Sequence, residues 1–338
     1  MAILDLSRGL SVVIPFFNEG SNTVRATKAV KSALGMINHP FEIIVVDDGS
    51  TDEITGSSFS EEIRYIRKEH SGRIETRLRG LQEAKYPYVL FIDARVWINE
   101  ESLINLNHLI QQYPDSRFWN GHVVLNPTSP LSSIWETLVG VGWRRISRFE
   151  TVKFGIEEFD DFPKGTGFFL ASKGDWINAF SKIANSKSSK VQISDDTKLL
   201  REFARTSDIW ISGQVSALYN SRDSINSFVQ NCFYRGQTFV DSYWESPTRF
   251  GRLVRWSFPI SIVLLAISAI QDLWFGPLGM VIAFLLICMG LLFIYSFKEW
   301  RSVKRAFRET VVLPALILFF GFGFVRAYVL GFQSRRNA

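Results

Sequence analysis

The sequence predicts an α/β domain with a Rossmann-like, mostly parallel sheet, followed by C-terminal transmembrane helices. Two observations carry this prediction. In the N-terminal third, short apolar runs alternate with helical patterns, which is typical of a parallel sheet covered by helices. From about residue 257 the chain changes to long apolar segments, and a helix needs roughly 20 such residues to cross a bilayer.

The strands and helices of this α/β domain can be assigned in order along the chain. Continuous apolar runs predict strands at 10–15, 41–46, 65–66 and 88–92. Apolar positions at helical spacing predict helices at 21–36 and 73–84. Each predicted helix therefore stands between two predicted strands, as the crossover connections of a parallel sheet require.

The composition excludes several classes of protein. Of the 338 residues, 46% are hydrophobic and the net charge is only +5, so the chain is not intrinsically disordered. The two cysteines, Cys232 and Cys288, are too far apart for a disulfide framework or a cysteine zinc site. Basic residues gather beside the apolar segments rather than in an aromatic-laced soluble patch, which indicates a membrane surface and argues against nucleic acid.

Acidic residues follow three of the predicted strands. Glu19 comes after the first, Asp47 and Asp48 end the second, and Asp93 follows the fourth. The carboxyl ends of parallel strands share one edge of the sheet, so we expect these side chains in one cleft. Gathered negative charges cost free energy unless donors or a cation compensate them. Such a cleft suits a nucleoside or a divalent metal ion.

We expect two regions, a cytoplasmic domain over 1–245 and a membrane region over 246–338. Three apolar segments predict membrane spans, at about 257–275, 277–297 and 311–332. Basic residues precede the first span and follow the second, so both flanks are expected in the cytoplasm. The segment 298–310 is predicted to be basic and interfacial.

The sequence does not decide whether the last apolar segment, 311–332, crosses the membrane. A third full span would place Arg335 and Arg336 outside the cell, against the positive-inside rule. A shallow or re-entrant segment would avoid this.

The N-terminal motifs resemble those of family-2 glycosyltransferases with the GT-A fold. The resemblance rests on an ordered series of motifs: VVIPFFNE at 12–19, IVVDDGSTD at 44–52, Ser71-Gly72, Arg77, FIDAR at 91–95, GTGFF at 165–169 and DDTKL at 195–199. It covers about residues 10–240. It implies inverting transfer of a sugar, hexosyl in type, from a nucleotide-diphosphate sugar in one displacement.

The resemblance also implies roles for individual residues. The implied donor site consists of Pro15, Phe17, Glu19, Asp47, Asp48, Ser50, Arg77, Asp93 and Arg95. Contacts to the acceptor or the diphosphate are implied for Gly165, Thr166, Gly167 and Arg235. Asp196 is implied as the base that takes the proton of the acceptor hydroxyl, with Asp195 as its acidic neighbour.

Arg95 departs from the family pattern, because it stands where the DxD motif has its second acid. Three interpretations are open: its guanidinium neutralises the diphosphate in place of a metal, Asp93 alone holds Mg²⁺ or Mn²⁺, or Arg95 points away and Asp93 merely caps its strand. A second departure lies at 230–236 (QNCFYRG), which lacks the tryptophan of the QxxRW motif of processive members. This favours a single transfer over polymer synthesis.

The predicted function is therefore transfer of a sugar to a membrane-associated acceptor, expected to be a polyprenyl-linked glycan of a cell-envelope polysaccharide or glycolipid. The expected partners are the nucleotide-diphosphate sugar, a lipid-linked or glycan acceptor and the bilayer. The expected location is the inner or plasma membrane, multi-pass, with the catalytic domain in the cytoplasm. Two alternatives stay open, a polyprenyl-phosphate sugar synthase and a non-catalytic membrane scaffold that binds a nucleotide sugar.

Overall fold

The computed structural model describes residues 4–126, 129–185, 196–244, 246, 248–257, 260 and 279–336. The chain forms two compact units, each assembled from several stretches. The first unit comprises Met1–Asn126, Gly142–Ser188 and Asp195–Ser221. The second unit comprises Pro127–Val141, Ser189–Ser194 and Arg222–Ala338.

The first unit contains a mixed sheet. Its described strands are β1 (Leu10–Phe16), β2 (Phe41–Asp47), β3 (Ile63–Arg67), β4 (Tyr88–Ile92), β5 (Val96–Ile98), β6 (Phe118–Asn126), β7 (Thr151–Phe154), β8 (Phe168–Ser172) and β9 (Ile209–Asn220). Their order is β3-β2-β1-β4-β8-β6-β9-β5, with β7 also paired to β9. Strands β5, β7 and β8 run opposite to the other described strands, so the sheet is mostly parallel and the predicted α/β class is confirmed.

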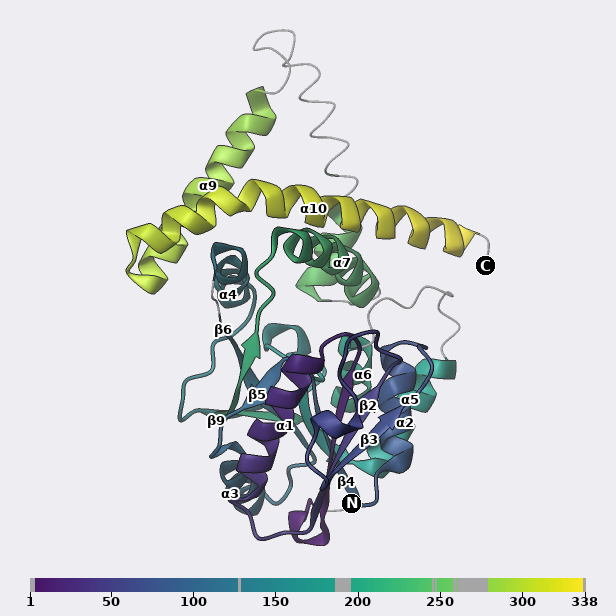
Figure 1. Ribbon diagram of the computed structural model, residues 1–338. Helices are drawn as coiled ribbons and strands as arrows, with labels where there is room; N and C mark the ends of the chain where they lie inside the picture. Colours follow the sequence, from purple (N-terminus) through teal and green to yellow (C-terminus); the bar gives the residue numbers. More distant parts are fainter. Residues whose placement is uncertain are drawn as a thin grey trace. The chain divides into compact units, whose positions relative to one another are not determined.

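Helices cover both faces of this sheet (Figure 1). One face packs against α1 (Gly20–Leu34) and α3 (Ser102–Gln112), and the other against α2 (Arg73–Glu83), α5 (Lys173–Asn185) and α6 (Asp196–Ala204). Successive strand residues point to opposite faces, so Val12 and Ile14 enter the first core and Val13 the second. Because β1 is buried on both faces, its sequence is a continuous apolar run.

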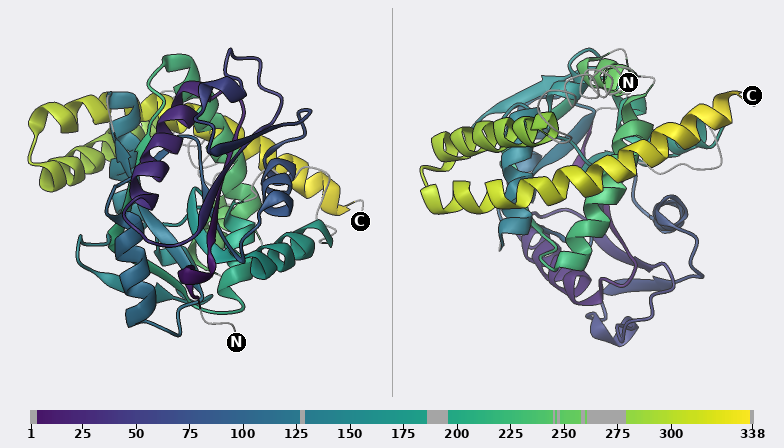
Figure 2. Two further views of the ribbon diagram at one scale, coloured as in Figure 1. Left: turned by 60° about the horizontal axis from the view of Figure 1, so that its bottom comes forward. Right: turned by 90° about the horizontal axis from the view of Figure 1, so that it is seen from above.

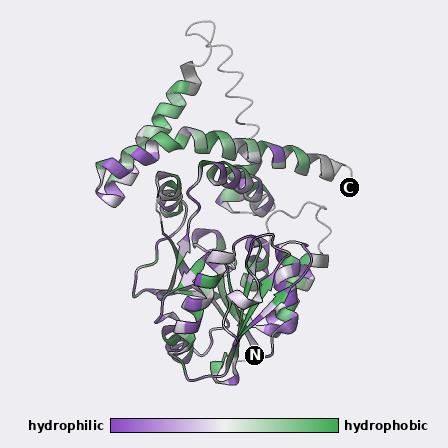
Figure 3. Ribbon diagram, in the orientation of Figure 1, coloured by the Kyte–Doolittle hydropathy of each residue, from purple (hydrophilic) through white to green (hydrophobic). Residues whose placement is uncertain are grey.

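The second unit is helical. Its labelled helices are α4 (Pro130–Gly142, all but the last residue), α7 (Ile225–Tyr243), α9 (Gly279–Trp300) and α10 (Val303–Arg336). Within α9 and α10, the stretches Ile282–Trp300 and Val303–Leu330 are long and apolar enough to cross a membrane by length and composition (Figure 3). The first predicted span, 257–275, lies almost wholly outside the described residues.

The two compact units do not meet at a single residue, and the predicted cytoplasmic region 1–245 and membrane region 246–338 stay a prediction. Helices α4 and α7 belong to the second unit because their apolar sides pack with α9 and α10. The shared core contains Ile134, Phe228, Cys232, Leu292, Leu313 and Leu316. The segment 298–310 is shared by the end of α9, at Trp300, and the start of α10, at Val303, and its interfacial position stays a prediction. Figure 2 shows the two helices meeting at this junction and diverging from it.

Helices α7 and α10 approach each other through glycine. A Cβ atom at Gly236 would lie 2.1 Å from the carbonyl oxygen of Phe320, and one at Gly323 would lie 2.0 Å from that of Phe233. Neither position has room for a side chain, so the two backbones touch. Small residues permit the same close crossing between membrane helices.

Candidate functional site

The ends of β1 and β2 form one hydrogen-bonded turn region. The amide of Asp48 donates to the carbonyl of Phe16 over 2.9 Å, and the amide of Asn18 donates to Ser50 Oγ over 2.8 Å. Asn18 has a φ of 52°, a left-handed conformation that asparagine adopts more readily than most residues. Ser50, predicted for the donor site, therefore shapes the loop that carries Phe17 and Glu19.

Asp47 is fully buried beneath this turn. Its Oδ1 accepts a hydrogen bond from the Ser50 amide over 2.8 Å, and its Oδ2 accepts one from the Tyr65 hydroxyl over 2.6 Å. Burial together with the neighbouring Asp47 carboxylate raises the pKa of Tyr65 to about 12. The geometry assigns Asp47 a structural role, and its contact with a nucleobase stays a prediction.

Asp48 holds the start of α2. Its Oδ1 and Oδ2 accept hydrogen bonds from the amides of Ser71 and Gly72 over 3.0 and 2.9 Å. Burial alone would raise the pKa of Asp48, but hydrogen bonds from Lys68 and these two amides outweigh it, so its pKa is lowered. The carboxylate thus remains charged and anchors the helix that carries Arg77.

An exposed aromatic pair lies at the same edge. The Phe17 ring is 42% exposed and stacks on the His70 ring, with 4.2 Å between the ring centroids. His70 Nδ1 also lies 2.9 Å from Asp48 Oδ2. Aromatic rings of this kind stack with nucleobases. The sequence singled out Phe17 but not His70, because no local pattern shows that the loop after β3 returns to the end of β1.

Arg77 joins two acids that are far apart in the sequence. Its guanidinium is 3% exposed, with Nη2 2.9 Å from Asp93 Oδ1 and Nη1 3.3 Å from Asp196 Oδ1. About a third of each carboxylate side chain remains exposed, 35% for Asp93 and 36% for Asp196. Thr166 Oγ1 also donates a hydrogen bond to Asp196 Oδ1. The predicted base and the predicted donor-site acid are therefore held by one buried cation.

The Gly165-Thr166-Gly167 loop fits closely against Asp93. The Asp93 amide donates to the Gly167 carbonyl over 3.0 Å, and a Cβ atom at Gly167 would lie 2.8 Å from Asp93 Oδ2. The Gly165 amide donates to Oδ1 of the buried Asn120 over 3.1 Å. Asn120 is a positioning residue that no sequence motif indicated.

Arg95 points toward Glu19 and the end of β9. Its Nε donates to Glu19 Oε1 over 2.7 Å, and its Nη1 donates to the Asn220 carbonyl over 2.8 Å. Asn22 closes the ring, donating to Glu19 Oε2 over 2.9 Å and accepting from Asn220 Nδ2 over 2.7 Å. Arg95 thus has internal partners, which matches part of the third interpretation. Asp93 does more than cap its strand, since it pairs with Arg77.

The described residues do not fit a Mg²⁺ or Mn²⁺ site. Across the part of the chain that the structure describes, no three His, Cys, Asp or Glu side chains gather as a metal site would require. Asp93 pairs with one guanidinium, and position 95 is a second guanidinium committed to Glu19. These positive charges oppose a divalent cation. Asp195 lies outside the described residues.

Two predicted site residues remain, Pro15 and Arg235. Pro15 is half-buried in β1, opposite Val46 of β2. Arg235 belongs to α7 in the second unit, where its guanidinium lies 4.5 Å from the Trp135 ring centroid. Its contact with a diphosphate stays a prediction.

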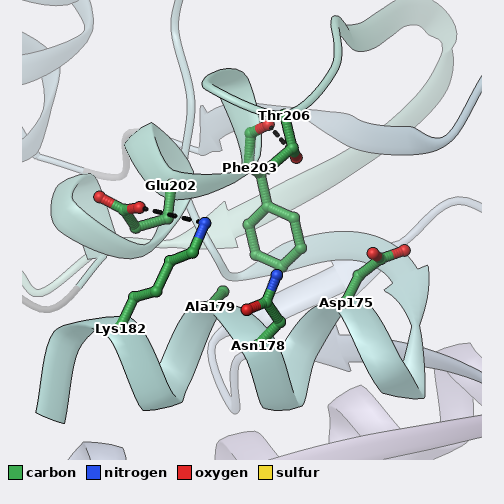
Figure 4. A pocket seen from close by; sticks show the side chains of 7 residues that line it. All are labelled: Asp175, Asn178, Ala179, Lys182, Glu202, Phe203 and Thr206. Atoms are coloured by element: carbon green, nitrogen blue, oxygen red, sulfur yellow. Dashed lines mark hydrogen bonds and ion pairs between the residues drawn. The ribbon is translucent and has the colours of Figure 1, made fainter. Parts of the chain in front are cut away.

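A small polar hollow lies elsewhere in the first unit, between α5 and α6 (Figure 4). Lys182 and Glu202 face each other across it, 3.9 Å apart. None of the predicted site residues lines it, so it is not the candidate site.

Comparison with known proteins gives a consistent result. Residues 11–125 match the model of the family described as glycosyl transferase family 2. Glycosyltransferase GlyA of Streptococcus pneumoniae is 34% identical over 110 residues, which is 31% of this chain and 15% of that protein. An uncharacterized glycosyltransferase of Rickettsia conorii is 34% identical over 89 residues, which is 25% of this chain and 14% of that protein.

Two further matches are more distant. The undecaprenyl-phosphate 4-deoxy-4-formamido-L-arabinose transferase of Pseudomonas savastanoi is 28% identical over 110 residues, 30% of this chain and 33% of that protein. The crystal structure of S. aureus TarS is 15% identical with a TM-score of 0.40, covering 72% of this chain and 41% of that one. The chain thus spans a third or less of the length of each of the three sequence relatives.

Proposed function

Because residues 11–125 match the model of glycosyl transferase family 2, we propose that this chain moves a sugar from a nucleoside diphosphate to a membrane-associated acceptor, with inversion at the anomeric carbon. The observation that carries this proposal is the Asp93–Arg77–Asp196 arrangement. It joins a candidate base to a fixed positive charge beside the strand ends. Inverting transfer needs both groups.

The donor nucleotide is proposed to bind at the ends of β1 and β2. The Phe17–His70 pair offers a flat aromatic surface for the base. Asp48 fixes the start of α2, and α2 carries Arg77 to the place proposed for the diphosphate. A guanidinium suits this position because its planar donors match phosphate oxygens.

The reaction is a single displacement. The acceptor oxygen attacks the anomeric carbon from the face opposite the diphosphate, and the bond from that carbon to the diphosphate oxygen breaks. Asp196 takes the acceptor proton, and the electron pair leaves with the diphosphate. Arg77 lies between the base and the donor-site acid Asp93, and from the Asp93 side it supplies positive charge as the leaving group develops. No step runs through a metal, because the described residues do not fit one.

We propose that the acceptor is lipid-linked. It would reach this chain, a multi-pass membrane protein in the proposal, at the cytoplasmic face of the inner or plasma membrane. Two observations support this. Helices α9 and α10 are long and apolar enough to span a bilayer. In addition, one relative is named as an undecaprenyl-phosphate transferase. That relative also makes the polyprenyl-phosphate sugar synthase the second candidate.

The test uses the full chain in detergent with a panel of labelled UDP- and GDP-sugars. Each donor is offered polyprenyl phosphate, a polyprenyl-diphosphate-linked sugar, or water alone. We expect transfer to the lipid-linked sugar, and Asp196→Asn should reduce it by about 100-fold or more because the hydroxyl loses its base. Asp208→Asn is the matched control, since Asp208 is exposed and pairs with Lys153.

Each other outcome selects a different function. Transfer to polyprenyl phosphate that survives Asp196→Asn would identify a synthase, because a phosphate nucleophile hardly needs a base. Donor binding without transfer or hydrolysis for any acceptor would identify a non-catalytic scaffold.

A further inference from the structure

The two long apolar helices of the second unit differ in how they are covered. From Ile282 to Leu291 no residue of α9 is buried, whereas Leu292 and Ser296 near its end are packed against protein. The exposed side chains are Ile282, Phe284, Leu286, Ile287, Leu291 and Ile294. A helix that is apolar and covered by protein only near one end suits a lipid environment along the rest of its length.

Helix α10 has one side packed against protein. Ala306, Glu309, Leu313, Leu316 and Gly323 are buried on this side, at helical spacing. Glu309 Oε2 accepts hydrogen bonds of 2.7 Å from Thr137 of α4 and from Ser296 of α9.

Further along α10, Gly323 contacts the backbone of α7. Protein from α4, α7 and α9 therefore covers this side of α10 along most of its described length.

The opposite side of α10 is an uncovered apolar stripe. Its members recur every three, four or seven residues, so they lie on one side of the helix: Val303, Phe307, Val311, Leu318, Phe322, Val325 and Val329. Each is at least 42% exposed. At 1.5 Å per residue this α10 stripe runs for about 40 Å. An apolar surface of this length needs a partner.

Lipid is the partner that fits the charges beside the stripe. Arg301, Lys304 and Arg308 are exposed at its start, where they can reach anionic headgroups while the stripe enters the acyl region. The same stripe is continuous in the chain with α9, the helix that suits the bilayer interior.

A crossing orientation of α10 conflicts with its packed side. Helix α7 would then lie at bilayer depth beside α10, with the exposed polar side chains Asn226 and Gln230 and the ionisable groups Arg235 and Asp241. Polar and charged groups at that depth are costly. An orientation along the surface leaves α7 on the aqueous side.

We infer that α10 lies along the cytoplasmic surface of the membrane, with the α10 stripe in the lipid and the α4–α7 side facing the cytoplasm. Helix α9 crosses, together with the first predicted span. This arrangement keeps Arg335 and Arg336 in the cytoplasm, as the positive-inside rule requires. The inference concerns membrane binding and does not depend on which sugar is transferred.

The first test measures depth along the stripe. Single cysteines replace Phe307, Leu318 or Val325 in the full chain with Cys232→Ala and Cys288→Ala, and carry a fluorophore in vesicles of phosphatidylcholine and phosphatidylglycerol. Quenching by lipids with nitroxides at shallow or deep positions reports the depth. We expect one shallow depth at all three positions, although about 27 Å separates the first from the last. Leu291→Cys on α9 is the deep reference. A maximum at 318, as deep as position 291, would overturn the inference.

The second test locates the C-terminus and needs no fluorophore on the stripe. Ala338→Cys is treated with a membrane-impermeant maleimide in intact spheroplasts and in inside-out vesicles. We expect labelling in inside-out vesicles only, as for the control Ser60→Cys in the first unit. The opposite is expected for Asp272→Cys, near the C-terminal edge of the first predicted span. Labelling of position 338 in intact spheroplasts would show that α10 crosses.

Discussion

The packing of the two units of this chain depends on different features of the sequence. In the first unit, side chains alternate across a sheet, so Val12 and Val13 enter different cores and the pattern is visible in the sequence. In the second unit, helices that are apolar along most of their length are aligned by a few particular contacts. Two of these are the Gly236–Gly323 crossing and the buried Glu309 carboxylate. Loss of one of these contacts should therefore disrupt the alignment of the helices in the second unit.

The largest expected effect comes from Gly323→Val. The new side chain would begin 2.0 Å from the Phe233 carbonyl oxygen, which cannot move without shifting α7. We expect the second unit to lose about 3 kcal/mol or more and to become sensitive to protease. Donor binding by the first unit should persist.

Gly321→Val is the matched control, because a Cβ atom at Gly321 meets nothing within 4 Å. Equal protease sensitivity of the two variants would show that the glycine crossing does not hold α7 to α10.

The next largest effect is expected from Arg77→Gln in the first unit. The change leaves Asp93 and Asp196 as neighbouring carboxylates without their shared cation. We expect transfer to fall by about 100-fold while the fold persists, as followed by initial rates and circular dichroism. Arg79→Gln, an exposed arginine on the same helix, is the control. Full activity of Arg77→Gln would contradict the proposed role of the Asp93–Arg77–Asp196 arrangement in sugar transfer.

A smaller effect is expected from Arg95→Ala. Its loss opens the ring formed with Glu19, Asn22 and Asn220, and leaves Glu19 without its charged partner. We expect about 1–2 kcal/mol of destabilisation by urea unfolding, with partial rescue in Arg95→Lys.

Nucleotide binding should be equal in EDTA and in Mn²⁺ for the wild type. A binding gain from Mn²⁺ would contradict the metal-free proposal.

The smallest effect concerns Tyr65 and depends on pH. In the folded protein its pKa is about 12, above its usual 10.0, so the folded state favours the neutral hydroxyl. The stabilisation is present in full below pH 10 and is lost as the pH rises through about 12. Tyr65→Phe removes it, on the order of 2 kcal/mol at most.

The stability difference between wild type and Tyr65→Phe should therefore narrow between pH 10 and pH 12 in urea unfolding. A constant difference across this range would mean that folding does not raise the pKa of Tyr65.

Much of the first unit was predictable from local pattern. The four strands at 10–15, 41–46, 65–66 and 88–92 are all present. The runs at 10–15, 41–46 and 88–92 lie in largely buried strands, whereas 65–66 lies in the half-buried edge strand β3. The second half of the sheet, from β5 to β9, was not predicted, including its antiparallel strands β5, β7 and β8. Its pairings join distant segments, such as β4 with β8, and no local periodicity records them.

The candidate site was predicted as residues rather than as contacts. Arg77, Asp93 and Asp196 were each indicated by a motif, but only the fold brings Arg77 between the two acids. The partner of Arg95 was beyond prediction, since Asn220 is 125 residues away in the chain. His70 and Asn120 were missed for the same reason.

By itself the sequence determined the α/β class, the resemblance to family 2 and the presence of long apolar helices, because these depend on composition and short-range spacing. Only the tertiary structure decided that Arg95 binds Glu19 and that α10 has a covered side and an exposed one. Mean hydropathy averages the side chains around a whole helix, so α9 and α10 have similar values, 1.9 and 2.0. Burial shows which side of each helix is covered, and the free energy depends on whether water, lipid or protein contacts that surface.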